Sequence, residues 1–285
     1  MNIVFLNGTY LPIEEAKISP LDRGFLFGDG IYEVIPSYAG KKIGFKAHME
    51  RMNDGFKAIG LKLNWSNSQW EELCDILIEK NGGGSLGIYL QVSRGADTKR
   101  FHGFPNNVKP TIFAMALTLQ TPETPDLKTA KSFALTSIED LRWKRCQIKS
   151  TSLLGNVLHF QESHDSGAQE ALLFNDKQEL TEASTANIFV IKNGVIATPV
   201  KSNQILHGIT RALVIDILAN DGSLAVEERI VTMDEVNHAD EIWITSSTKG
   251  IMPVTQLDDK PVGSGQVGRV WLAAATLYFN NKFNF

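Results

Sequence analysis

The first 120 residues alternate between strand-like and helix-like hydrophobic patterns. Apolar runs flank Asn7-Gly8, a dipeptide that adopts the positive φ angles of a tight hairpin turn. The predicted strands that follow cover residues 31–38, 43–45, 87–93 and 111–117. Apolar residues at helical spacing predict a helix over 46–60 and a second helix that contains Trp70, Leu73, Ile76 and Leu77.

A polar segment with two prolines, LQTPETPDL, separates the two halves of the chain and is typical of a linker. We therefore predict an N-terminal α/β domain over 1–120, a linker over 121–127 and a C-terminal domain over 128–285. The second half contains predicted strands at 132–138, 171–174, 187–191 and 241–245, and predicted helices at 153–166, 210–220 and 267–279. Thr232 and Glu235 form the capping box of another helix. The many hairpins indicate an α+β class and not the regular alternation of a doubly wound sheet.

The composition limits the kinds of molecule that we expect the protein to bind. The chain has 28 Lys and Arg against 32 Asp and Glu, a net charge of -4, and no basic run, so we expect no nucleic-acid partner. No stretch approaches the roughly 20 apolar residues of a bilayer span, and MNIVFLNGTY does not resemble a signal peptide. We expect a cytoplasmic protein without membrane contact.

Most familiar catalytic motifs are absent. The sequence contains no phosphate-binding P-loop, no G-x-S-x-G, no H-E-x-x-H and no C-x-x-C, and its six histidines lack the spacing of metal ligands. Gly24, Gly28 and Gly30 precede a strand and do not connect a strand to a helix, so they are not a dinucleotide fingerprint. We predict no metal site.

An ordered set of segments remains. It consists of DRGFLFGDGIYEV (22–34), HMERM (48–52), SRGADTKRFH (93–102), CQIKSTSLLGNVL (146–158), LTEASTANIFVIKNG (180–194), ILHGITR (205–211) and ITSSTKGIMPV (244–254). Together these segments resemble the class IV aminotransferases, the pyridoxal 5'-phosphate enzymes of fold type IV, and most closely the enzymes that act on D-amino acids. The resemblance implies two α/β domains with the cofactor at their interface, and a homodimer.

The resemblance also assigns roles to residues. Lys149 would carry the cofactor and move the Cα proton of the substrate, and Glu182 would face the pyridine nitrogen. Tyr32, Arg100 and His102 would bind the substrate carboxylate, because a guanidinium can hold a carboxylate through two parallel hydrogen bonds. The remaining cofactor-binding positions, for the phosphate and the ring face, would be Arg51, Leu206, Ile209, Thr210, Ser246 and Ser247.

The implied reaction is transamination of D-alanine with 2-oxoglutarate, which gives pyruvate and D-glutamate. Three alternatives stay open: a branched-chain L-amino acid aminotransferase, an aminodeoxychorismate lyase, and a protein that kept the fold without the chemistry. The pair Arg100 and His102 argues against the first two alternatives, because those relatives hold their substrates with different residues.

Overall fold

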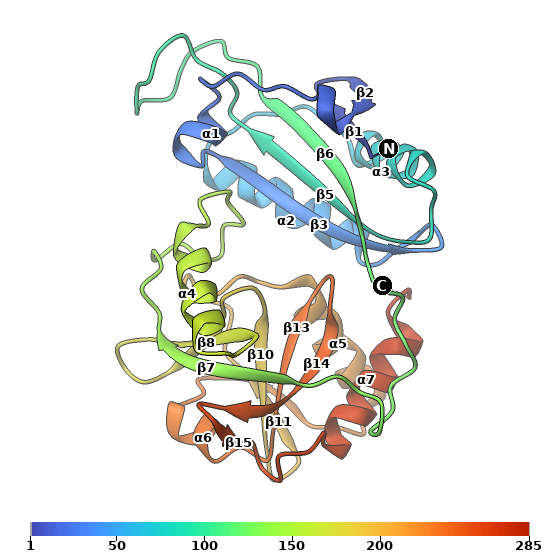
Figure 1. Cartoon of the computed structure of the whole chain (residues 1–285), viewed down its shortest axis with the longest axis vertical. Helices are drawn as coiled ribbons and strands as arrows, with labels where there is room; N and C mark the ends of the chain where they lie inside the picture. The colour runs from blue at the N-terminus through green and yellow to red at the C-terminus, as the bar shows by residue number, and fades with distance from the viewer. Residues whose placement is uncertain (1, 285) are drawn as a thin grey trace. The chain divides into compact units, whose positions relative to one another are not determined.

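The computed structural model describes residues 2–284 and divides into two compact units (Figure 1). Unit 1 contains the residues up to Thr121 together with Ile148–Leu153, and unit 2 contains Pro122–Gln147 and the chain from Leu154 onward. Residues 148–153 fall within the predicted C-terminal domain, 128–285. This segment belongs instead with unit 1 because its backbone pairs with a strand there: Tyr32 N donates to Lys149 O at 3.1 Å.

Unit 1 is an antiparallel sheet with helices on one face. Its strands follow the order β2-β1-β6-β5-β3-β4. Its elements are β1 (Ile3–Leu6), β2 (Thr9–Pro12), η1 (Ile13–Glu15), α1 (Arg23–Phe27), β3 (Gly30–Tyr38), β4 (Lys41–Lys42), α2 (Phe45–Ala58), α3 (Asn67–Lys80), β5 (Ser85–Ser93) and β6 (Thr111–Thr118). Side chains alternate along β3, so Ile31, Glu33 and Ile35 are buried on the helix-covered face while Tyr32 lies on the other face.

Unit 2 is built on a larger mixed sheet, whose strands run in the order β12-β11-β10-β13-β14-β7-β8-β9, with β15 paired to β14. The pairs β14–β7, β7–β8 and β11–β12 are parallel and the others are antiparallel. Its elements are β7 (Phe133–Glu139), α4 (Leu154–Asp165), β8 (Glu170–Phe174), β9 (Leu180–Ala183), β10 (Asn187–Lys192), β11 (Val195–Thr198), α5 (Ile209–Asp221), β12 (Val226–Glu228), α6 (Met233–Asn237), β13 (Glu241–Ser246), β14 (Gly250–Leu257), β15 (Lys260–Pro261) and α7 (Arg269–Asn281). Figure 1 shows α5 and α7 side by side.

The predicted mixed class is confirmed, and so are most elements. Asn7 and Gly8 both have positive φ at the first hairpin, and Thr232 caps α6 through the predicted capping box. The strand predicted at 43–45 is wrong, because Gly44 turns the chain with a φ of 62° and α2 already begins at Phe45. Within residues 2–284, no helix combines the length and the apolar character that a bilayer span requires.

Candidate active site

Lys149 lies beside Tyr32 in unit 1. The segment that carries Lys149 runs against β3, where Ser150 bridges to Ile31 and Thr151 N donates to Gly30 O at 3.0 Å. This backbone pairing brings Lys149 Nζ to 3.2 Å from the Tyr32 hydroxyl and 4.3 Å from the centre of its ring. A half-buried amine therefore stands next to a phenol that projects from a regular strand.

Arg51 binds Glu33, whose side chain lies on the face of β3 opposite to Tyr32. Its Nε and Nη2 each donate to a different carboxylate oxygen of Glu33 at 2.7 Å, and His48 Nδ1 lies 2.7 Å from one of these oxygens. Burial of Glu33 opposes its ionisation, but the charges and hydrogen bonds of Arg51 and His48 hold the pKa of this carboxyl well below its usual range. Glu33 thus fixes the direction in which the Arg51 guanidinium points.

Arg100 and His102 are exposed and share one aromatic neighbour in unit 1. The guanidinium carbon of Arg100 lies 5.1 Å from the ring centre of Phe27, and the His102 ring lies 5.2 Å from the same centre. The structure therefore gathers these two predicted carboxylate ligands on one surface. Both side chains reach solvent.

Glu182 is buried on β9 in unit 2. One carboxylate oxygen accepts from Arg142 Nη1 at 2.6 Å, and the other accepts from the main-chain N–H of Leu206 at 2.9 Å and from Asn187 Nδ2 at 3.1 Å. Burial raises the pKa of Glu182 to about 7, while the charge and hydrogen bond of Arg142 act in the opposite direction. The protonation of Glu182 is therefore sensitive to Arg142 and to any further cation that approaches it.

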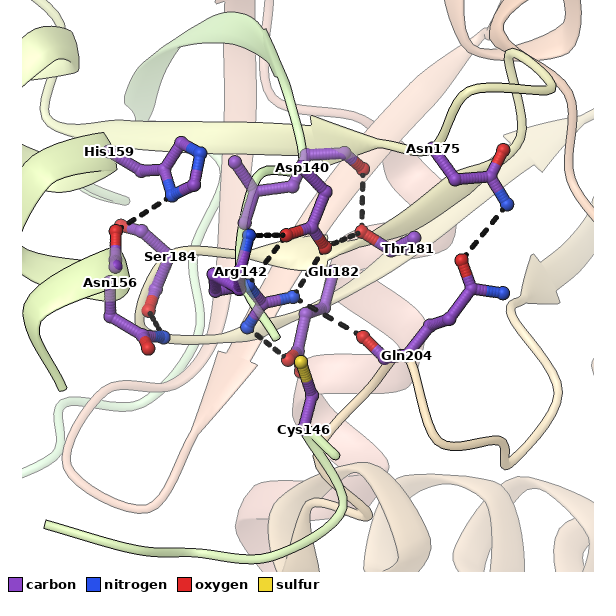
Figure 2. Close-up of polar contacts among 12 residues, drawn as sticks. Asp140, Arg142, Cys146, Asn156, His159, Asn175, Thr181, Glu182, Ser184 and Gln204 are labelled. Carbon is purple, nitrogen blue, oxygen red and sulfur yellow. Dashed lines mark hydrogen bonds and ion pairs between the residues drawn. The ribbon is translucent and has the colours of Figure 1, made fainter. Parts of the chain in front are cut away.

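Arg142 joins Glu182 to a second buried acid (Figure 2). Its Nε and Nη2 donate to the two oxygens of Asp140 at 2.9 and 2.7 Å, and Thr181 Oγ1 also donates to Asp140 at 2.8 Å. The side chains of Arg142 and Asp140 are 4% and 8% exposed, so these charges are largely removed from water. Together these contacts hold the Glu182 carboxylate in one orientation.

The start of α5 is tied to Glu182 through Asn187. Asn187 Nδ2 donates to Leu206 O at 2.8 Å as well as to Glu182, and a Cβ on Gly208 would lie only 1.9 Å from Asn187 Oδ1. Gly208 precedes the helix, so the buried Ile209 and Thr210 occupy its first turn, where backbone N–H groups lack partners within the helix. These N–H groups and the helix dipole favour an anion such as phosphate.

Ser246 and Ser247 lie where β13 turns into β14. Ser246 is the last residue of β13, and its hydroxyl accepts from Lys249 N at 3.3 Å. Both serines are partly buried. Ser246 therefore has at least a capping role in this turn, the ordinary role of a serine at such a position.

Sequence reasoning missed the acidic and basic partners of the predicted residues. Strand alternation places Glu33 toward the helices, and the i, i+3 spacing in HMERM puts His48 and Arg51 on one helix face, so this cluster could have been found. Nothing in the run LRWKR distinguishes the buried Arg142 from the exposed Arg145.

Comparison with known proteins decides the family. The family model described as amino-transferase class IV matches residues 30–257, a range that contains every predicted site residue. The chain belongs to the class IV aminotransferases. The family predicted from the ordered segments is thus confirmed.

Individual class IV aminotransferases are similar over nearly the whole chain. A D-alanine aminotransferase of Staphylococcus epidermidis is 41% identical over 271 residues, which cover 95% of this chain and 94% of the relative. One from Listeria monocytogenes is 35% identical over 267 residues, covering 94% and 91%. Among solved structures, the T.th. branched-chain amino acid aminotransferase in complex with N-(5'-phosphopyridoxyl)-L-glutamate has a TM-score of 0.89 at 26% identity, over 99% of this chain and 94% of that chain.

Proposed function

We propose that this class IV aminotransferase moves the amino group of a D-amino acid to an oxo acid, with D-alanine and 2-oxoglutarate as the expected pair. The observation that carries the proposal is the hydrogen bond between Lys149 Nζ and the Tyr32 hydroxyl, which places an amine next to a residue of the predicted carboxylate-binding set. The two D-alanine aminotransferases, at 41% and 35% identity, support this substrate over the branched-chain enzyme at 26%.

The residues present fit pyridoxal 5'-phosphate by their chemistry. In unit 1, Arg51 would offer the positive charge that a phosphate dianion needs. In unit 2, the N–H groups at the start of α5 and the hydroxyls of Ser246 and Ser247 would offer hydrogen-bond donors. Glu182 supplies a buried carboxylate for the pyridine nitrogen, and the side chain of Leu206 would pack against the ring. When bound, this cofactor acts as an electron sink for negative charge at the substrate Cα.

The side chains of the protein have separate roles in the reaction. Lys149 takes the proton from the substrate Cα and later returns it, and the Tyr32 hydroxyl orients the amine for this transfer. Glu182 acts in its ionised form, which Arg142 favours. Arg100 and His102 bind the substrate carboxylate and thereby set which face of Cα the Lys149 amine reaches.

Replacement of Lys149 tests the proposal directly. We expect Lys149→Ala to lose D-alanine turnover by at least a thousandfold, whereas Lys144→Ala, a change at an exposed lysine five residues earlier, keeps it. Pyruvate formation would be followed with D-alanine and 2-oxoglutarate, and formation of 4-methyl-2-oxopentanoate would be followed when L-leucine replaces D-alanine. An active Lys149→Ala variant would refute the role of Lys149, and turnover of L-leucine alone would assign the chain to the branched-chain alternative.

We also propose a homodimer and a cytoplasmic location. The dimer is supported by α4, where Leu154, Val157 and Leu158 are 70%, 56% and 60% exposed, since a solvated helix seldom presents three large aliphatic side chains together. Light scattering on the purified protein measures its mass, and a monomer at micromolar concentration would contradict this part of the proposal.

A further inference from the structure

Two buried arginines of unit 1 share a partly buried aspartate, in motifs that the proposed function leaves unexplained. Arg23 and Asp29 come from DRGFLFGDG, and Arg94 follows β5. Asp29 Oδ2 accepts from Arg23 Nε at 2.8 Å and from Arg94 Nε at 2.7 Å, and Asp29 Oδ1 accepts from Arg94 Nη2 at 3.0 Å. Buried ionic groups often stabilise a fold no better than apolar side chains would, so the geometry that they impose is the better reason for their presence.

The far end of Arg23 holds a loop backbone. Its Nη1 donates to the carbonyl oxygens of Phe101 at 2.5 Å and Gly103 at 3.3 Å. Its Nη2 donates to the carbonyl oxygen of His102 at 3.3 Å. One buried guanidinium therefore binds three consecutive peptide carbonyls, which begin directly after Arg100.

Phe27 holds the side chains of the same loop. It ends the short helix α1, which Arg23 begins, and Arg23 lies 4.8 Å from the centre of its ring. Arg100 and His102 contact this ring from the loop, at the distances given above. A guanidinium and an imidazole that rest on a common ring lose rotamer freedom before any substrate arrives.

Arg94 contacts the next part of the same loop, at Phe104. Its guanidinium lies 3.7 Å from the ring centre of Phe104, and its Nη2 and Nη1 donate to the carbonyl oxygens of Ile59 at 2.7 Å and Gly60 at 3.3 Å. Asp29 links Arg94 to Arg23, so the loop is held on both sides of His102 by one continuous network.

We propose that Arg23 and Phe27, with Asp29 and Arg94 behind them, are positioning residues that set how well Arg100 and His102 bind the substrate carboxylate. The inference rests on the proposed function, because it takes these two residues as the carboxylate ligands. A two-point grip on a carboxylate requires the guanidinium plane to be fixed, and an exposed loop alone does not fix it.

Kinetics of two variants test the proposal. Arg23→Lys keeps the charge beside Asp29 but loses the fork that reaches the loop carbonyls, and Phe27→Leu removes the ring without changing any charge. We expect each variant to raise the KM for D-alanine about tenfold or more, from the loss of charge-assisted hydrogen bonds or of the ring, with kcat changed less than about threefold. Phe25→Leu, in the same short helix but 71% exposed, is the matched control and should change neither constant.

Limited trypsin digestion supplies a readout that does not depend on activity. The exposed Lys99 and Arg100 are tryptic sites, and cleavage there follows local opening of the loop. We expect cleavage at these sites to be about tenfold faster in Arg23→Lys and Phe27→Leu than in the wild type or Phe25→Leu.

An Arg100→Ala variant distinguishes a failure of the positioning role from a failure of the proposed function. If Arg100→Ala raises the KM for D-alanine but Arg23→Lys and Phe27→Leu leave the KM and the cleavage rate unchanged, the positioning role is wrong and the proposed function stands. If Arg100→Ala itself leaves the KM unchanged, the carboxylate role in the proposed function is wrong, whatever the cleavage rates show about the loop. A fall in kcat at constant KM in the two positioning variants would indicate general damage and would also overturn the inference.

Discussion

Replacement of Arg142 by Gln tests whether the buried pairing around Glu182 is as tight as its distances indicate. The change removes four hydrogen bonds, one to Glu182, two to Asp140 and one to Gln204 O at 3.3 Å. Glu182 keeps its bonds from Leu206 N and Asn187, but neither carboxylate keeps a cationic partner. Breaking a buried ion pair by removing one partner typically costs about 3–5 kcal/mol.

The loss of stability in Arg142→Gln should also depend on pH, and this dependence is the more specific test. Without Arg142, the pKa values of both Glu182 and Asp140 rise, and a carboxyl whose folded pKa lies above its unfolded value lowers stability as pH increases. For Glu182 in the wild type this window runs from its ordinary 4.5 to about 7, and in the variant it extends further upward. The stability deficit of Arg142→Gln should therefore be larger at pH 8 than at pH 5.

Thermal unfolding, followed by circular dichroism on cofactor-free protein, measures both effects. At about 2–4 °C per kcal/mol for domains of 150–250 residues, the expected loss at pH 8 is roughly 6–20 °C. Arg145→Gln is the matched control, because Arg145 lies three residues away and is exposed. A deficit under about 1 kcal/mol, or one that is equal at both pH values, would refute the idea that Arg142 neutralises two buried carboxylates.

Two further predictions concern the supports of the proposed phosphate ligands. Glu33→Gln should cost about 3–5 kcal/mol near pH 7, because Arg51 loses its buried counter-charge. Since the folded pKa of Glu33 lies below its ordinary 4.5, this deficit should begin to shrink below about pH 4.5; urea unfolding at pH 7 and pH 4 checks it, and a deficit that grows on acidification would contradict it. Gly208→Ala should cost about 1–3 kcal/mol, because the new Cβ would lie 1.9 Å from Asn187 Oδ1 and the Asn187 side chain is already committed to Glu182. Urea unfolding measures this cost too, and an unchanged stability would mean that Asn187 moves aside easily.

Much of the fold could be read from local patterns. The Asn7-Gly8 turn, the capping box at Thr232 and the helix-spaced apolar residues before Gly60 each depend on a few neighbouring residues, and each is present in the structure. The short helix α1 was missed because its five residues, RGFLF, contain a glycine and span little more than one turn.

The supporting side chains depend on long-range pairing, which no single segment encodes. Arg23 and the loop carbonyls that it binds are about 80 positions apart, and Arg142 and Glu182 are 40 apart. In both cases the sequence shows only a charged residue, and charged residues are usually exposed. The assignment of Lys149 to unit 1 also depends on the structure. Its segment joins unit 1 through hydrogen bonds to β3, and the residues that surround Lys149 in the sequence do not predict these bonds.

A visible absorption spectrum of the purified protein, recorded before and after addition of D-alanine or L-leucine, tests the central claim most directly. We predict a yellow band from the lysine-bound cofactor that bleaches with D-alanine and persists with L-leucine, and we expect this band to be absent from Lys149→Ala. A protein that stays colourless with added pyridoxal 5'-phosphate, or a band that only L-leucine bleaches, would contradict the account.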